Sequence, residues 1–143
     1  MRVAINGFGR IGKLVFRAFL EKKLKNVDII AINELGSLES TYHLMQFDST
    51  HGRLPINIIK TTKGLKHKNK NIFFYSERDP KNLPWSEKKI DVVLECSGIF
   101  TTKEKAQAHI DAGAKKVIIS APASNVDATI VQGVNNKILN KKH

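Results

Sequence analysis

The stretch Ile5–Gly12, INGFGRIG, decides the fold of this chain. It overlaps a short apolar run at 2–6 that is typical of a buried parallel strand. In a dinucleotide-binding turn, Gly7 would allow the tight exit from the strand, Gly9 the approach of a pyrophosphate, and Gly12 the close packing of the next helix. The N-terminus of that helix would offer free N–H groups to the phosphates. The stretch therefore predicts a dinucleotide site.

The residues around the turn support this prediction, because a glycine pattern alone also marks ordinary turns. Apolar side chains recur at helical spacing after the glycines: Ile11, Leu14, Val15, Ala18 and Phe19. A second apolar run at 28–33 is typical of the next strand. Glu34 stands 22 residues after Gly12, where an acidic side chain is expected to bind the ribose hydroxyls of adenosine. This order of features indicates NAD as the cofactor.

Length and composition are those of one globular domain, which we expect to span residues 1–143. No apolar run approaches the ~18 residues of a membrane span, and a strand that begins at Arg2 leaves no room for a signal peptide. Cys96 is the only cysteine, which excludes an internal disulfide and a multi-cysteine metal site. We therefore expect a cytoplasmic protein with neither a metal site nor a membrane partner.

The formal net charge of +11 can mark a nucleic-acid partner. Much of it lies in Lys60–Lys70 and in the Lys141-Lys142 pair, and neither stretch interleaves aromatic side chains with its lysines as a stacking platform would. We therefore interpret these lysines as a solvated surface and regard nucleic-acid binding as the weaker alternative.

Strand-like and helix-like segments alternate along the chain, which predicts a Rossmann-type, doubly wound α/β fold with a mainly parallel sheet. Further strands are expected at 91–96, 116–120 and 129–131. Capping signals predict a helix from Ser37 to about Phe47, and a helix to Gly113 that begins with Thr101 and Glu104 as a capping box.

An antiparallel excursion is expected between the second strand and the strand at 91–96. The apolar groups at 56–59 and 72–74 flank the polar stretch 63–71, which is typical of a hairpin. Residues 48–53 (DSTHGR) are predicted to form a loop.

Four of the predicted strands end in small or polar residues. Because ligands of open α/β sheets bind beyond the carboxyl ends of the strands, one cleft should collect these ends. They are Asn6-Gly7, Asn33-Glu34, Cys96-Ser97-Gly98 and Ser120-Ala121.

Several motifs, in order and spacing, resemble the glyceraldehyde-3-phosphate dehydrogenase family. They are INGFGRIG at 5–12, DSTHGR at 48–53, ERDP at 77–80, ECSG at 95–98, AGAKKVIISAP at 112–122 and GVN at 133–135. The resemblance covers the whole chain, but it corresponds only to the N-terminal, NAD-binding part of that family.

The resemblance implies roles at the cofactor. Main-chain N–H groups of Arg10 and Ile11 would bind the pyrophosphate, and Arg78 would lie by the adenine. Phe100 would line the approach to the nicotinamide, although Arg78 and Phe100 fit a loop charge and a core aromatic equally well. The expected cofactor-binding set is Asn6, Gly7, Phe8, Gly9, Arg10, Ile11, Gly12, Asn33, Glu34, Arg78, Ser97, Gly98, Phe100 and Ser120.

The catalytic half of the family is not expected within residues 1–143. Its nucleophilic cysteine lies in an SNASCTTN segment after the GVN strand, and this chain ends at His143 before such a segment. Cys96 has no basic partner nearby in sequence and fits a small core residue. The resemblance thus implies the cofactor half of an aldehyde-phosphate oxidoreductase, inactive alone, with a catalytic domain as partner in what is usually a homotetramer.

Within the family, residues 31–35 (AINEL), 83–85 (LPW) and 123–129 (ASNVDAT) favour the erythrose-4-phosphate dehydrogenase branch, whereas 48–51 (DSTH) favours the triose enzymes. A stand-alone nucleotide-binding or regulatory protein is the other alternative.

Overall fold

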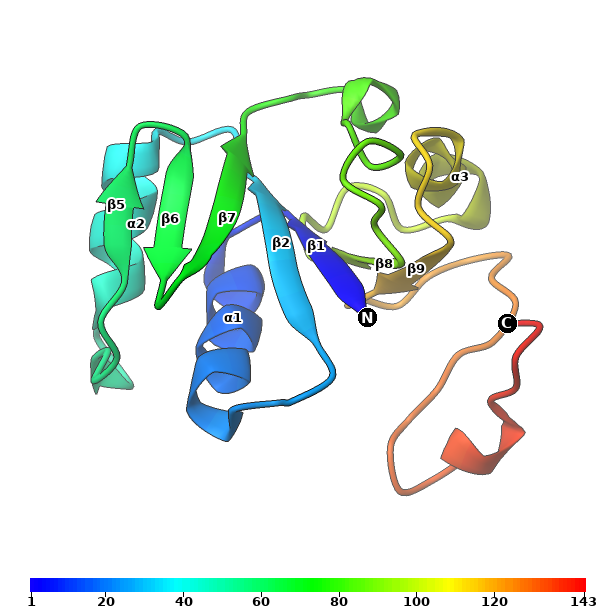
Figure 1. Ribbon diagram of the computed structural model, residues 1–143. Helices are drawn as coiled ribbons and strands as arrows, with labels where there is room; N and C mark the ends of the chain where they lie inside the picture. Colours follow the sequence, from blue (N-terminus) through cyan, green and yellow to red (C-terminus); the bar gives the residue numbers. More distant parts are fainter.

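Alternate residues of the first strand enter two separate hydrophobic clusters. Val3 and Ile5 of β1 (Arg2–Asn6) belong to one cluster, and Ala4 belongs to the other. Strands that are buried on both faces have nearly continuous apolar sequences, as this one does. The computed structural model describes residues 1–143, and Figure 1 shows β1 within the sheet.

The main sheet has seven strands in the order β5-β6-β7-β2-β1-β8-β9. β1 pairs in parallel with β2 (Asp28–Asn33) on one side and with β8 (Val92–Glu95) on the other. β7 (Lys70–Tyr75) adds in parallel to β2, and β9 (Lys116–Ile119) adds in parallel to β8. The predicted Rossmann-type α/β fold with a mainly parallel sheet is confirmed, and the strand order reverses at β1.

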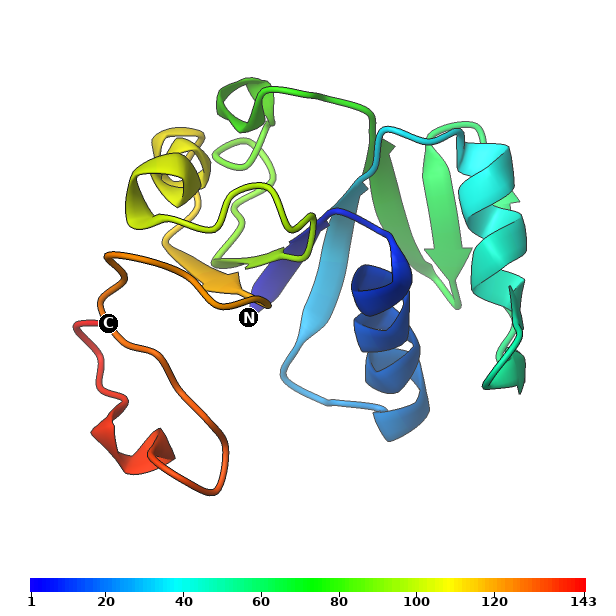
Figure 2. The same cartoon turned by 180° about the vertical axis from the view of Figure 1, so that it is seen from behind.

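Helices cover this sheet. Their bounds are Arg10–Lys22 for α1, Leu38–Gln46 for α2 and Lys103–Asp111 for α3. Phe16 of α1 and Met45 of α2 share the cluster that contains Ile5, so both helices lie on one face, as Figures 1 and 2 show. Ala112, which follows α3, joins Ala4 on the opposite face. None of the helices is long and apolar enough to span a membrane.

One of the two predicted helix caps lies one residue later than expected. Ser37 caps α2 as predicted, because its side chain accepts the N–H of Ser40 at 3.1 Å. α3 is capped by Thr102 and not by Thr101, since the Thr102 hydroxyl accepts the N–H of Lys105 at 3.2 Å. The carbonyl of Thr101 instead accepts the N–H of Ser124, which holds that residue outside the helix.

The antiparallel excursion contains one more strand than predicted. β5 (Ile59–Thr61), β6 (Gly64–His67) and β7 form an antiparallel meander, so the stretch expected as a polar turn is itself a strand. Leu65 explains this, because only 1 % of its surface is exposed, while Gly64 and Lys66 on either side of it add no apolar side chain to the pattern. The chain reverses into β7 at Lys68, whose φ of 53° is left-handed.

The DSTHGR stretch is not wholly a loop. β3 (Phe47–Asp48) and β4 (Gly52–Arg53) pair as a two-stranded antiparallel ribbon. The connection after β7 contains the short 3-10 helix η1 (Pro80–Asn82), and Trp85 beyond it is fully buried.

The strand predicted at 129–131 does not form. The N–H of Val131 donates to the side chain of Asn135 at 2.7 Å, and no neighbouring strand pairs with the segment. Residues 121–143, with the 3-10 helix η2 (Asn136–Ile138), run beside the sheet as an extended arm in both views. Lys116 of β9 donates to the carbonyl of Lys141 at 3.1 Å and tethers the end of this arm.

Candidate dinucleotide-binding site

The glycine turn is packed against the ends of two neighbouring strands. Gly7 has a φ of +86°, and its N–H donates to the carbonyl of Asn33 at 2.9 Å. A β-carbon on Gly7 would lie 2.5 Å from the main chain of Ser97. Position 7 therefore requires glycine for both its conformation and its space.

The other two glycines of the motif have opposite surroundings. A β-carbon on Gly12 would lie 2.2 Å from the carbonyl oxygen of Gly7 and 3.3 Å from the Ile5 side chain, so α1 approaches the turn closely. A β-carbon on Gly9 would meet nothing within 4 Å. The space next to Gly9 is open, as the approach of a phosphate requires.

The N-terminus of α1 has no cap from the protein. No side chain bonds to it, the first turn carries no acidic residue, and the first N–H bonded back is that of Lys13, to Gly9 at 3.1 Å. Arg10 and Ile11 are exposed there. Free N–H groups and the helix dipole make this end suited to an anion.

Glu34 lies directly beside the turn. Its carboxylate accepts the N–H of Phe8 at 2.6 Å and the N–H of Gly36 at 3.1 Å. The ring of Phe8 is buried in the core, where it packs edge-on against Phe16 with 5.6 Å between ring centroids. Only the main chain of Phe8 therefore faces the site.

Beneath the turn, the side chains of Asn6 and Asn33 are buried and bond to protein groups. The Asn33 amide donates to Asn6 Oδ1 at 2.7 Å and to the carbonyl of Glu77 at 2.8 Å, and its oxygen accepts the Glu77 N–H at 2.8 Å. The Asn6 amide donates to Glu95 at 2.6 Å. These two residues shape the site from below.

Sequence reasoning missed the importance of Glu95 and His109. Both are buried, with 1 % and 0 % of their surface exposed, and His109 Nε2 lies 2.9 Å from Glu95 Oε2. Burial opposes ionisation of Glu95, but hydrogen bonds from His109, Ser97 and Asn6 outweigh it and hold its pKa below the ordinary value. An acidic residue at the end of an apolar strand was the available signal, because a buried carboxylate needs partners.

The remaining predicted residues lie around the carboxyl ends of β8 and β9. Ser97 donates to Glu95 through its N–H at 2.8 Å and through its hydroxyl, and a β-carbon on Gly98 would project into open space. Ser120 is exposed at the end of β9. Phe100 is half-buried with its ring against His109, at 6.0 Å between centroids, which favours a packing role.

Two further residues to place are Arg78 and Cys96, and the main-chain N–H of Cys96 donates to the carbonyl of Asn6 at 2.7 Å beside the turn. The Arg78 side chain is exposed on the loop after β7. Burial raises the pKa of the Cys96 thiol above its usual range, which makes it a poor nucleophile at neutral pH. No group of three or more His, Cys, Asp or Glu side chains could hold a metal ion.

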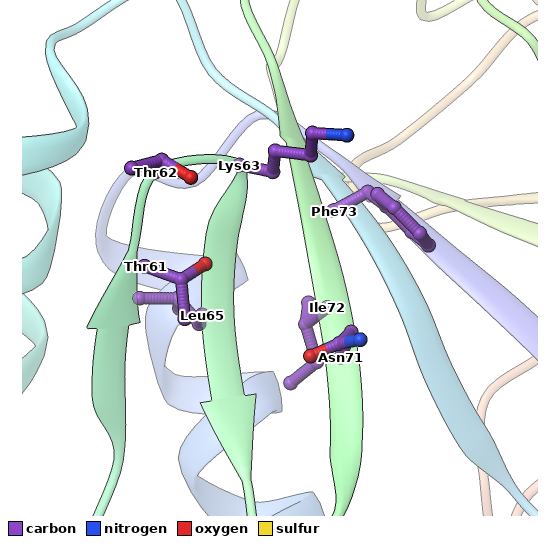
Figure 3. A pocket seen from close by; sticks show the side chains of 7 residues that line it. All are labelled: Thr61, Thr62, Lys63, Leu65, Asn71, Ile72 and Phe73. Carbon is purple, nitrogen blue, oxygen red and sulfur yellow. The ribbon is translucent and has the colours of Figure 1, made fainter.

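A more enclosed hollow lies elsewhere, on the antiparallel strands. Figure 3 shows it among β5, β6 and β7, with Lys63 and Phe73 at its border. Its volume of about 140 Å³ is below the range of ligand pockets. The glycine turn lies outside this hollow and borders open space at Gly9, so the single cleft expected at the strand ends stays a prediction.

Together, the fold and the turn define a dinucleotide-binding domain of the Rossmann type. The uncapped helix follows β1, the strand at which the sheet order reverses, and ligands of such sheets bind at this switch point.

Comparison with known proteins narrows this class. Residues 1–103 match the family described as glyceraldehyde 3-phosphate dehydrogenase, NAD binding domain. The chain is 49 % identical over 141 residues to the chromosomal glyceraldehyde-3-phosphate dehydrogenase of Cupriavidus necator, and 48 % identical over 141 residues to that of Mycoplasma pneumoniae. It is 44 % identical over 142 residues to the Thermotoga maritima enzyme. The chain belongs to the glyceraldehyde-3-phosphate dehydrogenase family, and the part of that family to which it corresponds is the NAD-binding domain.

The alignments cover 97 %, 98 % and 99 % of this chain but only 42 %, 41 % and 43 % of the three relatives. The chain therefore spans about two fifths of the length of the curated relatives it matches. The family predicted from the motifs is confirmed.

Proposed function

We propose that residues 1–143 form one NAD-binding unit whose site is the glycine turn and the neighbouring ends of β2, β8 and β9. The observation that carries this proposal is the uncapped N-terminus of α1 beside open space at Gly9. The pyrophosphate would accept hydrogen bonds from the main-chain N–H groups of Arg10 and Ile11.

Glu34 would select NAD over NADP. Its carboxylate already lies beside the turn, 2.6 Å from the Phe8 N–H, and could exchange that partner for the ribose hydroxyls. The extra phosphate of NADP would place a second negative charge next to the Glu34 carboxylate, and the repulsion between the two charges would weaken binding of NADP.

Calorimetric titration with the two cofactors tests the assignment of Glu34. NAD should bind more tightly than NADP by about tenfold or more, because like charges at short range cost more than one hydrogen bond gains. The Glu34→Gln variant should narrow this difference, since it removes the charge and keeps an acceptor. A parent protein that binds NADP as tightly as NAD would contradict the assignment.

We infer further that this unit serves a dehydrogenase that oxidises glyceraldehyde 3-phosphate, because the matched relatives carry that name. NAD, when bound, accepts the hydride from the aldehyde carbon. The protein surface that would meet the nicotinamide lies around Ser97, Gly98 and Ser120. A catalytic domain with the nucleophilic thiol would be the partner of this unit.

Erythrose 4-phosphate is the alternative substrate. Leu83 and Trp85, which favoured that branch in the sequence, are buried in the core with 3 % and 0 % of their surface exposed. They therefore cannot contact an aldehyde. Turnover of the complete enzyme with both aldehydes would separate the two substrates.

A further inference from the structure

Glu95, buried at the carboxyl end of β8, accepts hydrogen bonds from four donors. Asn6 and His109 reach Oε2 at 2.6 and 2.9 Å. The N–H of Ser97 reaches Oε1 at 2.8 Å, and the Ser97 hydroxyl donates to the same oxygen. The carboxylate thus joins β1, β8 and α3 at one point.

The polarity of this network is fixed at its α3 end. The Trp85 indole N–H can only donate, and it lies 3.1 Å from His109 Nδ1. Nδ1 is therefore the acceptor, and the ring proton sits on Nε2, facing Glu95. The ring cannot reverse these roles without setting two donors against each other.

The polarity is also fixed at the other end. The main chain of Glu77 both donates to Asn33 and accepts from it, at 2.8 Å each, so the Asn33 amide has one allowed orientation. Its N–H₂ group must then donate to Asn6 Oδ1, at 2.7 Å, and the Asn6 amide must donate to Glu95. The amide groups of Asn33 and Asn6 and the ring of His109 thus each have one allowed orientation, in which Asn6 and His109 both donate to the Glu95 carboxylate.

The groups that Glu95 holds are those that border the glycine turn. Asn6 immediately precedes Gly7, and the main chain of Ser97 is so close to the turn that a β-carbon on Gly7 would lie 2.5 Å from it. Asn33 immediately precedes Glu34. The carboxylate therefore links the residue before the turn to the end of β8, beside the main-chain bond from the Cys96 N–H to the Asn6 carbonyl at 2.7 Å, and it is itself buried.

We propose that Glu95 is a positioning residue of the NAD site: as a buried acceptor of four donors, it holds the glycine turn and the main chain at Ser97 in the arrangement that the cofactor requires. This inference rests on the proposed NAD site. A glutamine cannot replace the carboxylate, because its amide group would face donors whose orientation is fixed at both ends of the network.

The test compares Glu95→Gln with the matched control Asp91→Asn. Asp91 joins the opposite ends of the same two strands, since it accepts the Arg2 N–H at 2.8 Å and pairs with Lys115 at 2.6 Å. Well below the melting temperature of each variant, Glu95→Gln should weaken NAD binding by about tenfold or more, and Asp91→Asn should leave it within about twofold.

A spectroscopic measurement accompanies the affinities. The ¹⁵N shifts of the His109 ring in the parent should show the proton on Nε2, and Glu95→Gln should change them because the facing acceptor is lost. Should Glu95→Gln fail to fold, His109→Phe removes one donor to Glu95 while keeping a ring between Trp85 and Phe100, and it should also weaken NAD binding.

The outcomes separate this inference from the proposed function. A parent protein that binds no NAD overturns the proposed site itself. If the parent binds NAD and the affinity of Glu95→Gln, or of its substitute His109→Phe, is within about twofold of the parent's, the positioning role alone is overturned. Equal losses in Glu95→Gln and Asp91→Asn, or unchanged ring shifts in Glu95→Gln, also overturn the positioning role.

Discussion

At position 12 a β-carbon would lie 2.2 Å from the carbonyl oxygen of Gly7, whereas at position 9 it would meet nothing within 4 Å. The two glycines of one motif thus meet different requirements. Gly12 is needed by the folded protein, because α1 could not approach the turn with a larger residue. Gly9 has room for a side chain in the free protein, so its need arises only when a ligand approaches.

Substitution by valine should separate these requirements. Gly9→Val should leave the melting temperature close to that of the parent, since the side chain points into open space, and it should abolish measurable NAD binding. Gly12→Val should destabilise the fold by roughly 1–3 kcal/mol or more through overpacking, and should weaken binding as well. Thermal melts with and without NAD measure both effects. NAD binding by Gly9→Val at the parent's affinity would place the site elsewhere.

At the scale of an element, the ribbon of β3 and β4 is held at two points. Asp48 Oδ1 accepts the N–H groups of Thr50 at 2.8 Å and His51 at 2.6 Å, which closes the turn. The buried guanidinium of Arg17 on α1 donates to the carbonyls of His51, Gly52 and Arg53 at 3.0–3.1 Å. The DSTHGR motif therefore forms an ordered turn that the side chain of Arg17 fastens to α1.

Because of Asp48 at the turn of this ribbon, the stability of the fold should decrease at acidic pH. The main-chain N–H groups of His51 and Thr50 lower the pKa of Asp48 from 3.8 to about 2. A lowered folded-state pKa contributes stability that is complete above the unfolded pKa, near 3.8, and is lost as the pH falls through about 2. Asp48→Asn should therefore melt below the parent at neutral pH and converge with it toward pH 2.

Melting temperatures of both proteins across that range measure the effect. The other carboxylates, Glu95 included, are common to both proteins, so the difference isolates Asp48. A difference that stays constant down to the lowest pH would show that the Asp48 charge does not contribute.

For the whole molecule, the parallel sheet brings to one edge residues that lie far apart in sequence. The two hydrophobic clusters on its faces hold the strands in register, and the carboxyl ends of β1, β2, β8 and β9 meet beside the turn. Several large apolar side chains of the arm at 121–143 are exposed instead of packed, among them Val131, Val134 and Leu139. The arm contributes little to the core.

Residues 1–143 alone should bind NAD without turning over an aldehyde phosphate. Cys96, the only thiol, is half-buried with a raised pKa and is unsuited to form a thiohemiacetal. Spectrophotometry with glyceraldehyde 3-phosphate and with erythrose 4-phosphate should show no NADH. Reduction of NAD that persists in pure protein and disappears in Cys96→Ser would contradict this expectation.

Much of the fold could be predicted from local patterns. The runs at 2–6 and 28–33, the glycines and the helical spacing after them predict strands and a turn because they constrain the backbone residue by residue. Segments with weaker patterns were less predictable. Leu65 is the one apolar side chain of its segment, and pairing with β5 and β7 on either side makes that segment a strand.

The sequence by itself determined the parallel α/β fold, the glycine turn and the place of Glu34 after the second strand, since these depend on spacing along the chain. Only the tertiary structure decided that Asn6 donates to Glu95, 89 residues away, and that Trp85 fixes the orientation of His109. The physical reason is the satisfaction of buried polar groups. A buried carboxylate must find donors, but which donors reach it depends on how distant strands and helices pack.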